Sequence, residues 1–331
     1  MASNKRIFSG IQPSGALHIG NYLGAIKQFV ELQDAHEAFY CIVDEHAITV
    51  PQEPDQLRSD TLAVALTYLA EGVDPKKSVI FVQSHVPAHA ELAWILNTFT
   101  PMGELERMTQ FKEKRQKQKA VYAGLFNYPT LMAADILLYH TGLVPVGKDQ
   151  LQHIELTRSL AERFNNRFGE TFTIPEPRLK KEAALIMSLT SPSKKMSKSD
   201  EDEGSRINLG DSPETIRKKI KAAVTDSSAE IKYDPNAKPA ISNLLVIFSE
   251  FAGKPTATLE QEYAGKSYAD FKADLAEAVV EGLAPLQKKI TELKRDEKAV
   301  LTILRDGSQK AAVIANQTLA EVKQKIGFLL L

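Results

Sequence analysis

The chain has 331 residues, of which 43% are hydrophobic and 25% are charged, with a formal net charge of −1 at pH 7. This length predicts about two domains, and the near-neutral charge excludes binding to nucleic acid through the overall field of the protein. The single cysteine, Cys41, excludes an intramolecular disulfide. No hydrophobic signal region begins the chain, and no apolar run approaches the ~20 residues of a membrane span. We therefore expect a soluble, cytoplasmic protein with no membrane partner.

The first half of the chain alternates strand and helix patterns. Five short β-rich runs predict strands at residues 6–9, 38–43, 79–83, 143–146 and 185–189. Helical patterns lie between them, at residues 21–33 and at residues 55–72, where Gly72 ends the helix. This alternation predicts the α/β class, with a Rossmann-like, doubly wound parallel sheet covered by helices on both faces.

The second half is predicted to be helical throughout. Helical patterns occupy residues 211–224, 242–253, 267–283 and 308–327, and no alternating strand pattern interrupts them. We therefore expect a first domain over residues 1–207 and a C-terminal helical domain, built as a bundle, over residues 208–331.

The first predicted strand runs into a glycine-containing turn at residues 13–15 and then into a helix from Ile19. A helix N-terminus beside such a turn favours an anion, but the lysine of a Walker A loop is missing here. His18 offers an imidazole N–H, Gly20 leaves room for a flat group, and Asn21 offers a polar contact. The alternative is a plain turn and helix cap, with His18 on the surface.

A basic loop at residues 193–204 follows the last predicted strand and carries Lys194, Lys195 and Lys198. Charged runs of this kind are commonly solvated surface loops. However, α/β sheets bind their ligands at the carboxyl ends of their strands. The loop is therefore a second candidate for the anion site.

The segments 18-HIGN-21 and 195-KMSKS-199 together resemble the signature pair of the class I aminoacyl-tRNA synthetases. The resemblance implies that His18, Asn21, Lys195 and Lys198 stabilise the charge that develops when an amino acid carboxylate attacks the α-phosphate of ATP. His18 would act as a hydrogen-bond donor and not as a general base. The lysine missing from the opening turn would then come from the distant basic loop.

Residues 131–139 form a helical pattern that is apolar on all sides except at Asp135. A carboxylate buried without a partner costs several kcal/mol, so one alternative is that Asp135 faces solvent or an arginine. A tryptophan indole, with one N–H donor and no acceptor, would complement a carboxylate at the end of an apolar pocket. Such a site would reject phenylalanine, which leaves the acid unpaired.

Several further segments resemble the bacterial-type tryptophanyl-tRNA synthetases. They are residues 8–15, 44–50, 81–91, 103–114, 126–153 and 241–245. The resemblance implies that L-tryptophan is activated by ATP, with Mg²⁺ arriving with the nucleotide, and is then transferred to tRNA(Trp). It also implies a homodimer built through an insertion at about residues 104–184, and anticodon recognition by the helical domain. No protein-bound metal and no DNA partner are expected.

The same resemblance assigns individual site residues. ATP would contact Gln12, Pro13, Ser14, Gly20, Asn21, Lys114, Gly147, Lys148, Asp149, Ile186, Lys195, Met196, Ser197, Lys198 and Ser199. Tryptophan would contact Asp135 through its indole, and Tyr128 and Gln150 through its ammonium group. The chain departs from the family's pattern at Glu45, Lys148, Leu151, Leu185 and the acidic run at residues 200–203.

Three other functions remain in view. A tyrosyl-tRNA synthetase would share the fold, and its substrate would offer Asp135 a phenolic O–H. A nucleotidylyltransferase can carry a similar histidine turn, but the helical second domain argues against it. A non-catalytic RNA-binding paralogue would have no need of the intact HIGN and KMSKS residues. Outside these motifs, Trp94 is expected in the core, and His85 and His89 are not expected to bind metal because Pro87 lies between them.

Overall fold

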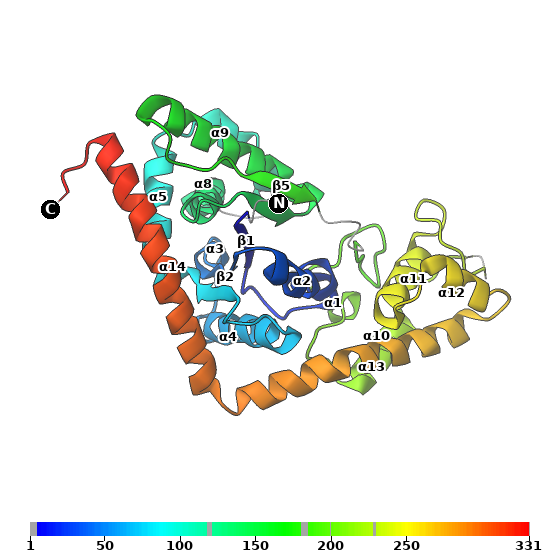
Figure 1. Ribbon diagram of the computed structural model, residues 1–331. Helices are drawn as coiled ribbons and strands as arrows, with labels where there is room; N and C mark the ends of the chain where they lie inside the picture. The colour runs from blue at the N-terminus through cyan, green and yellow to red at the C-terminus, as the bar shows by residue number, and fades with distance from the viewer. Residues whose placement is uncertain (1–4, 118–120, 180–184, 199, 228–229, 331) are drawn as a thin grey trace.

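The computed structural model describes residues 5–117, 121–179, 185–198, 200–227 and 230–330, without the side chains of residues 113, 114, 116 and 117. Its centre is a parallel sheet in the order β3-β2-β1-β4-β5 (Figure 1). The strands are β1 (Ile7–Ile11), β2 (Ala38–Ile42), β3 (Ser78–Val82), β4 (Leu143–Val146) and β5 (Glu176–Leu179). The winding therefore reverses between β1 and β4, which is where doubly wound sheets place their ligands.

Four of the five predicted strands are confirmed, and the fifth is wrong. Residues 185–189 form only an antiparallel bridge between Met187 and Lys195. The apolar side chains of Ile186 and Leu189 are buried in a core cluster, but their segment does not pair with the central sheet. The true last strand, β5, was missed because all four of its residues are exposed and one of them is a proline, which an edge strand tolerates.

Side chains alternate between the two faces of the sheet and feed two cores. Ile7, Tyr40 and Ile80 point into the first core, whereas Phe39 and Phe81 point into the second. Helices that line the first face are α1 (Ile19–Asn21), a π-helical turn (Tyr22–Ile26), α2 (Lys27–Ala35) and α4 (Pro54–Glu71). Helices that line the second are α5 (Ala88–Asn97), α8 (Ala123–Leu137) and α9 (Leu151–Phe168). In sequence, α3 (Asp44–Ala47) precedes α5, whereas α6 (Met102–Glu106) and α7 (Thr109–Lys117) lie between α5 and α8. The predicted α/β class and sheet architecture are confirmed.

Trp94 does not belong to the core, so that prediction is wrong. Leu92, Ile95 and Leu96 recur at the helical period and form the buried face of α5, whereas Trp94 lies outside this face. Its side chain is 71% exposed.

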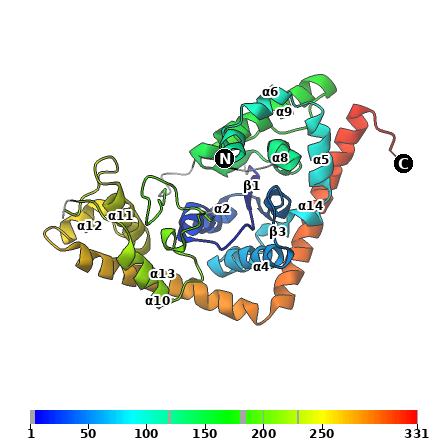
Figure 2. The same cartoon turned by 180° about the vertical axis from the view of Figure 1, so that it is seen from behind.

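The C-terminal half is helical, as predicted, but its last helix leaves the bundle. The helices are α10 (Pro213–Ala222), α11 (Pro239–Ala252), α12 (Thr256–Glu262), α13 (Tyr268–Lys294) and α14 (Glu297–Ile326). The first three gather beside the sheet, α13 runs back from them past α4, and α14 turns sharply to run along β3 (Figures 1 and 2). Within the parts of the chain that the structure describes, no helix is both long and apolar enough to cross a membrane.

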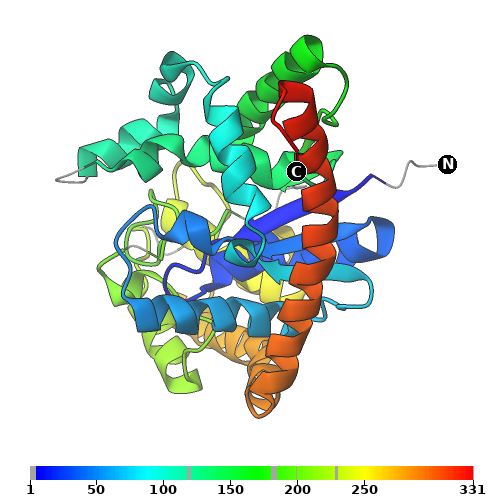
Figure 3. The same cartoon turned by 90° about the vertical axis from the view of Figure 1, so that its left-hand side faces the viewer.

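Helix α14 covers the β3 edge of the sheet (Figure 3). Leu304 joins the first core and Ala311 the second, so this helix connects the two. Gly307 permits the close approach, because an added Cβ would overlap the Ile80 carbonyl oxygen of β3. The helix thus protects an edge strand that would otherwise offer unpaired backbone groups.

Candidate active site

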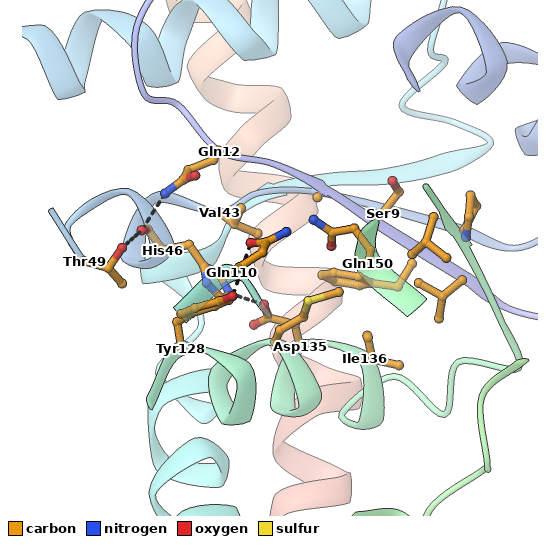
Figure 4. Close-up of a pocket in the computed structure, with 16 residues that line it drawn as sticks. Ser9, Gln12, Val43, His46, Thr49, Gln110, Tyr128, Asp135, Ile136 and Gln150 are labelled. Carbon is orange, nitrogen blue, oxygen red and sulfur yellow. Dashed lines mark hydrogen bonds and ion pairs between the residues drawn. The ribbon is translucent and has the colours of Figure 1, made fainter. Parts of the chain in front are cut away.

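A cavity of about 190 Å³ opens at the carboxyl ends of β1 and β4 (Figure 4). The two strands pair at their amino ends through Ile7 and Leu143, and the cavity lies between their later residues. It is lined by Phe8, Ser9, Gly10, Gln12, Val43, His46, Thr49, Gln110, Tyr128, Met132, Asp135, Ile136, Val144, Pro145, Val146 and Gln150. An apolar cavity of ~150 Å³ accepts a benzene ring, so this one has room for an aromatic side chain.

Asp135 lies at the buried end of this cavity and is 1% exposed. Asp135 does not face solvent, and no arginine in the part of the chain that the structure describes pairs with it. Instead, Oδ1 accepts hydrogen bonds from Gln83 Nε2 (2.7 Å) and His89 Nδ1 (2.6 Å), and Oδ2 accepts one from His46 Nε2 (2.8 Å). These donors come from three elements: α3, the 3₁₀ turn Gln83–His85, and α5.

The three donors keep the carboxylate ionised. Burial alone would raise the pKa of Asp135, but the hydrogen bonds from His46 and His89 lower this pKa to about 2. A carboxylate has about four acceptor positions, and three are filled. One position on Asp135 therefore remains for a ligand donor.

Tyr128 and Gln150 line the same cavity as Asp135, so the three residues assigned to tryptophan are brought together. The Tyr128 hydroxyl donates to Gln110 Oε1 (3.2 Å) and also lies 2.7 Å from His153 Nε2. In Figure 4 the Tyr128 side chain lies beside Asp135, and Gln110 lies close to both.

The HIGN turn begins the helix that follows β1. The His18 Nδ1 accepts the Gly20 N–H (3.1 Å), while the Asn21 Oδ1 accepts the His18 N–H (3.2 Å), which together form a capping box. Gly20 is needed because an added Cβ would lie 2.9 Å from the His18 ring. The Ile186 Cβ would be the next neighbour at 3.7 Å, so Ile186 lies beside this turn.

His18 is a neutral donor in this setting. It is 3% exposed, so the alternative of a surface histidine is wrong. Burial, with smaller contributions from the charges of Lys198, Arg206 and Lys195, lowers the pKa of His18 to about 3. Because Nδ1 accepts a hydrogen bond, the ring proton of the neutral imidazole lies on Nε2. That N–H is the group that a developing anion would meet.

The KMSKS loop reaches the opening turn directly. Lys198 Nζ donates to the Gln12 carbonyl oxygen (2.9 Å), so the distant lysine does lie at the HIGN side of the sheet. Burial lowers the pKa of Lys198 to about 8, with Asp60 opposing this shift. Asp60, on α4, accepts the Gly15 N–H (2.8 Å) and thereby holds the turn.

The remaining assigned residues divide into three groups. Pro13 and Ser14 belong to the opening turn, and Gly147, Lys148 and Asp149 follow β4 directly, with the last two exposed. In the loop, Met196 is buried, and its backbone N–H donates to the Ile186 carbonyl oxygen (3.0 Å). Ser197 is half-buried, and Lys195 is exposed. Ser199 and the Lys114 side chain lie outside the described residues.

Sequence reasoning missed the partners of these residues. His46, Gln83 and His89 are spread over the chain, and only the need of a buried Asp135 for donors pointed toward them. No signal in the sequence pointed to Asp60 as the acceptor of the Gly15 N–H. The acidic run at residues 200–203 contacts Arg206, which donates to Asp200 O (2.8 Å) and Glu203 Oε1 (2.6 Å).

The fold and the paired HIGN and KMSKS elements define a class I tRNA synthetase, and the family model for "tRNA synthetases class I (W and Y)" matches residues 2–284. The tryptophan–tRNA ligase of Caldanaerobacter subterraneus subsp. tengcongensis is 56% identical over 326 residues, covering 98% of this chain and 99% of that protein. The crystal structure of tryptophanyl-tRNA synthetase from Mycoplasma pneumoniae matches with a TM-score of 0.91 at 37% identity, covering 98% of both chains. That from Campylobacter jejuni, complexed with ADP and tryptophan, matches with a TM-score of 0.83 at 41% identity, covering 98% of this chain and 100% of the other. The chain belongs to the tryptophan–tRNA ligase family.

Proposed function

We propose that this protein activates L-tryptophan with ATP, releasing pyrophosphate, and then transfers the tryptophanyl group from the adenylate to the 3′ end of tRNA(Trp). Family membership supports the reaction. The observation that carries the substrate is the ring-sized cavity that ends on the ionised, buried Asp135 carboxylate.

In the amino acid site, the open acceptor position of Asp135 takes the indole N–H. Tyr128 and Gln150, on the same cavity, take the ammonium group. Phenylalanine would fill the space but leave the carboxylate without its last donor, and a buried polar group left unpaired costs about 1–3 kcal/mol. Specificity therefore follows from polar matching and not from size alone.

In the ATP site, the carboxylate of tryptophan attacks the α-phosphorus while pyrophosphate leaves. The His18 Nε2–H and the ammonium groups of Lys195 and Lys198 offset the charge that grows on the phosphates, which is the role of preorganised donors. Asn21 supports the reaction as the capping partner of His18. Mg²⁺ enters with ATP and is held mainly by phosphate oxygens and water, as is usual for this ion.

The other nucleotide contacts follow the resemblance. The ribose hydroxyls meet Gly147, Lys148 and Asp149, and adenine packs near Ile186. The set is completed by Gln12, Pro13, Ser14, Gly20, Lys114, Met196, Ser197 and Ser199.

Residues 1–207 form the catalytic unit, and residues 208–331 recognise the tRNA anticodon. The protein works in the cytoplasm as a homodimer built through the insertion at about residues 104–184. Large exposed apolar side chains in or beside this insertion support the dimer: Trp94, Met102 and Tyr122 are 71%, 65% and 60% exposed.

ATP–pyrophosphate exchange measured with each standard amino acid, without tRNA, tests this function. We expect exchange with tryptophan alone. Exchange with tyrosine would keep the fold and the chemistry but overturn the pocket, whereas folded protein that binds ATP and exchanges with no amino acid would favour the non-catalytic paralogue.

Asp135→Asn tests the pocket separately, because the amide presents one acceptor oxygen in place of two. The preference for tryptophan over phenylalanine should fall. An unchanged preference would move the indole contact to another residue.

A further inference from the structure

The strongest feature outside the assigned residues is a buried chain of hydrogen bonds behind Asp135. Tyr139 Oη lies 2.7 Å from His89 Nε2, and His89 Nδ1 lies 2.6 Å from Asp135 Oδ1. Both His89 and Tyr139 are 0% exposed, and neither lines the cavity. These groups therefore act on a ligand only through Asp135.

The direction of each hydrogen bond follows from the charges. An ionised carboxylate only accepts, so His89 Nδ1 carries a proton, and in the neutral imidazole Nε2 then accepts from the Tyr139 hydroxyl. Burial raises the pKa of Tyr139 well above its usual value, which keeps this hydroxyl protonated as a donor. The Tyr139 ring is in turn fixed by stacking against Phe39, with centroids 4.8 Å apart, and against Phe8, with centroids 5.8 Å apart.

The two carboxylate oxygens of Asp135 have different surroundings. Oδ1 is occupied from behind by His89 and Gln83, both 0% exposed. Among the described residues, Oδ2 is bonded only to His46, which itself lines the cavity. Because His89 and Gln83 occupy both acceptor positions of Oδ1, the open acceptor position lies on Oδ2, the oxygen bonded to the cavity-lining His46.

We propose that His89 is a positioning residue for amino acid specificity: with Gln83, it fixes the Asp135 carboxylate so that Oδ2 presents its open acceptor position to the cavity, and Tyr139 fixes the His89 tautomer. This inference rests on the proposed role of Asp135 as the indole acceptor. It extends the specificity determinant to side chains that do not touch the substrate.

Three variants test the proposal by ATP–pyrophosphate exchange, with KM and kcat measured for tryptophan and ATP and kcat/KM for phenylalanine. His89→Leu removes the donor to Asp135, whereas His89→Asn keeps an N–H near the position of Nδ1. His85→Leu is the matched control, because His85 is an exposed histidine four residues earlier. We expect His89→Leu to raise the tryptophan KM by about 10- to 100-fold, as for the loss of one hydrogen bond to a charged group, with the ATP KM unchanged.

The preference for tryptophan over phenylalanine should fall in His89→Leu and be largely restored in His89→Asn. A general packing defect would instead lower thermal stability in both variants and move both KM values together. Folded His89→Leu with unchanged tryptophan KM and unchanged preference overturns the proposal. If His89→Leu does not fold, Gln83→Met, which removes the other donor to Oδ1, decides by the same criterion.

Asp135→Asn separates the positioning role of His89 from the proposed indole contact at Asp135. If it weakens tryptophan preference while the His89 and Gln83 variants do not, the positioning role fails and the proposed pocket stands. If none of them changes preference, the indole contact itself lies elsewhere.

Discussion

At the residue scale, the proposed chemistry depends most on the neutral imidazole of His18. Its Nδ1 is used by the Gly20 N–H, so only the Nε2–H is available to a ligand. A donor that meets charge only in the transition state changes the rate far more than it changes ground-state binding.

We expect His18→Ala to slow adenylate formation by about 10²–10³-fold, the usual cost of one preorganised donor. The KM values for ATP and tryptophan should change much less. Single-turnover measurement of adenylate checks this, with His18→Gln as a control that keeps a side-chain N–H. A collapse of affinity at an unchanged chemical rate would make His18 a binding residue.

Lys198 predicts an alkaline limit to activity. A lysine whose pKa is lowered to about 8 is cationic below that pH and neutral above it. The kcat/KM for ATP, which reports the free enzyme, should therefore fall as the pH rises through about 8. In Lys198→Arg the guanidinium stays charged, so the residual activity should not fall as the pH rises through about 8. If the same fall persists in this variant, another group is responsible for it.

At the residue scale, the sequence identified the polar residues of the candidate site but not their hydrogen-bond partners. Asp135 was identified because a carboxylate in an otherwise apolar helix is costly to bury without hydrogen-bond partners. Its three donors come from residues 46, 83 and 89, and no periodicity connects them. Pairing of this kind depends on the tertiary arrangement, which one chain's pattern does not contain.

At the scale of elements, the buried strands were predictable and the edge was not. Strands β1 to β4 are mostly buried and carry apolar runs, whereas β5 is exposed and has none. Residues 185–189 are apolar because Ile186 and Leu189 pack into a core from a loop. Apolar runs thus predict burial more reliably than they predict pairing in a sheet.

Helix α14 provides a stability prediction. Glycine to alanine in a helix is usually stabilising by up to ~1 kcal/mol, but at Gly307 the new Cβ would overlap the backbone of Ile80. We expect Gly307→Ala to destabilise the protein by roughly 1–3 kcal/mol, the usual range for overpacking. Urea unfolding measures this against Gly103→Ala, where the first neighbour is the flexible end of Arg107 at 3.4 Å; equal stability of the two variants would contradict the close approach.

At the scale of the whole molecule, the exposed Trp94 bears on assembly. It is the only tryptophan of the chain, so intrinsic emission at 295 nm excitation without substrate reports this one position. If the homodimer forms through this region, light scattering should give twice the 36.6 kDa chain mass. Dilution should then shift the emission to the red as the indole meets water.

Trp94→Glu should reduce the dimer by placing a charge in an apolar interface, while Trp94→Phe should largely preserve it. A dimer that survives Trp94→Glu with unchanged affinity would place the interface on another surface.

The position of α14 also bears on how the protein is made. During synthesis, β3 leaves the ribosome more than 200 residues before the helix that covers its edge, since β3 ends at Val82 and α14 begins at Glu297. Until then the nascent chain carries an open strand edge, which is a template for pairing with other chains. Premature termination anywhere before α14 would therefore yield fragments that are prone to aggregate, even when every assigned catalytic residue is already present.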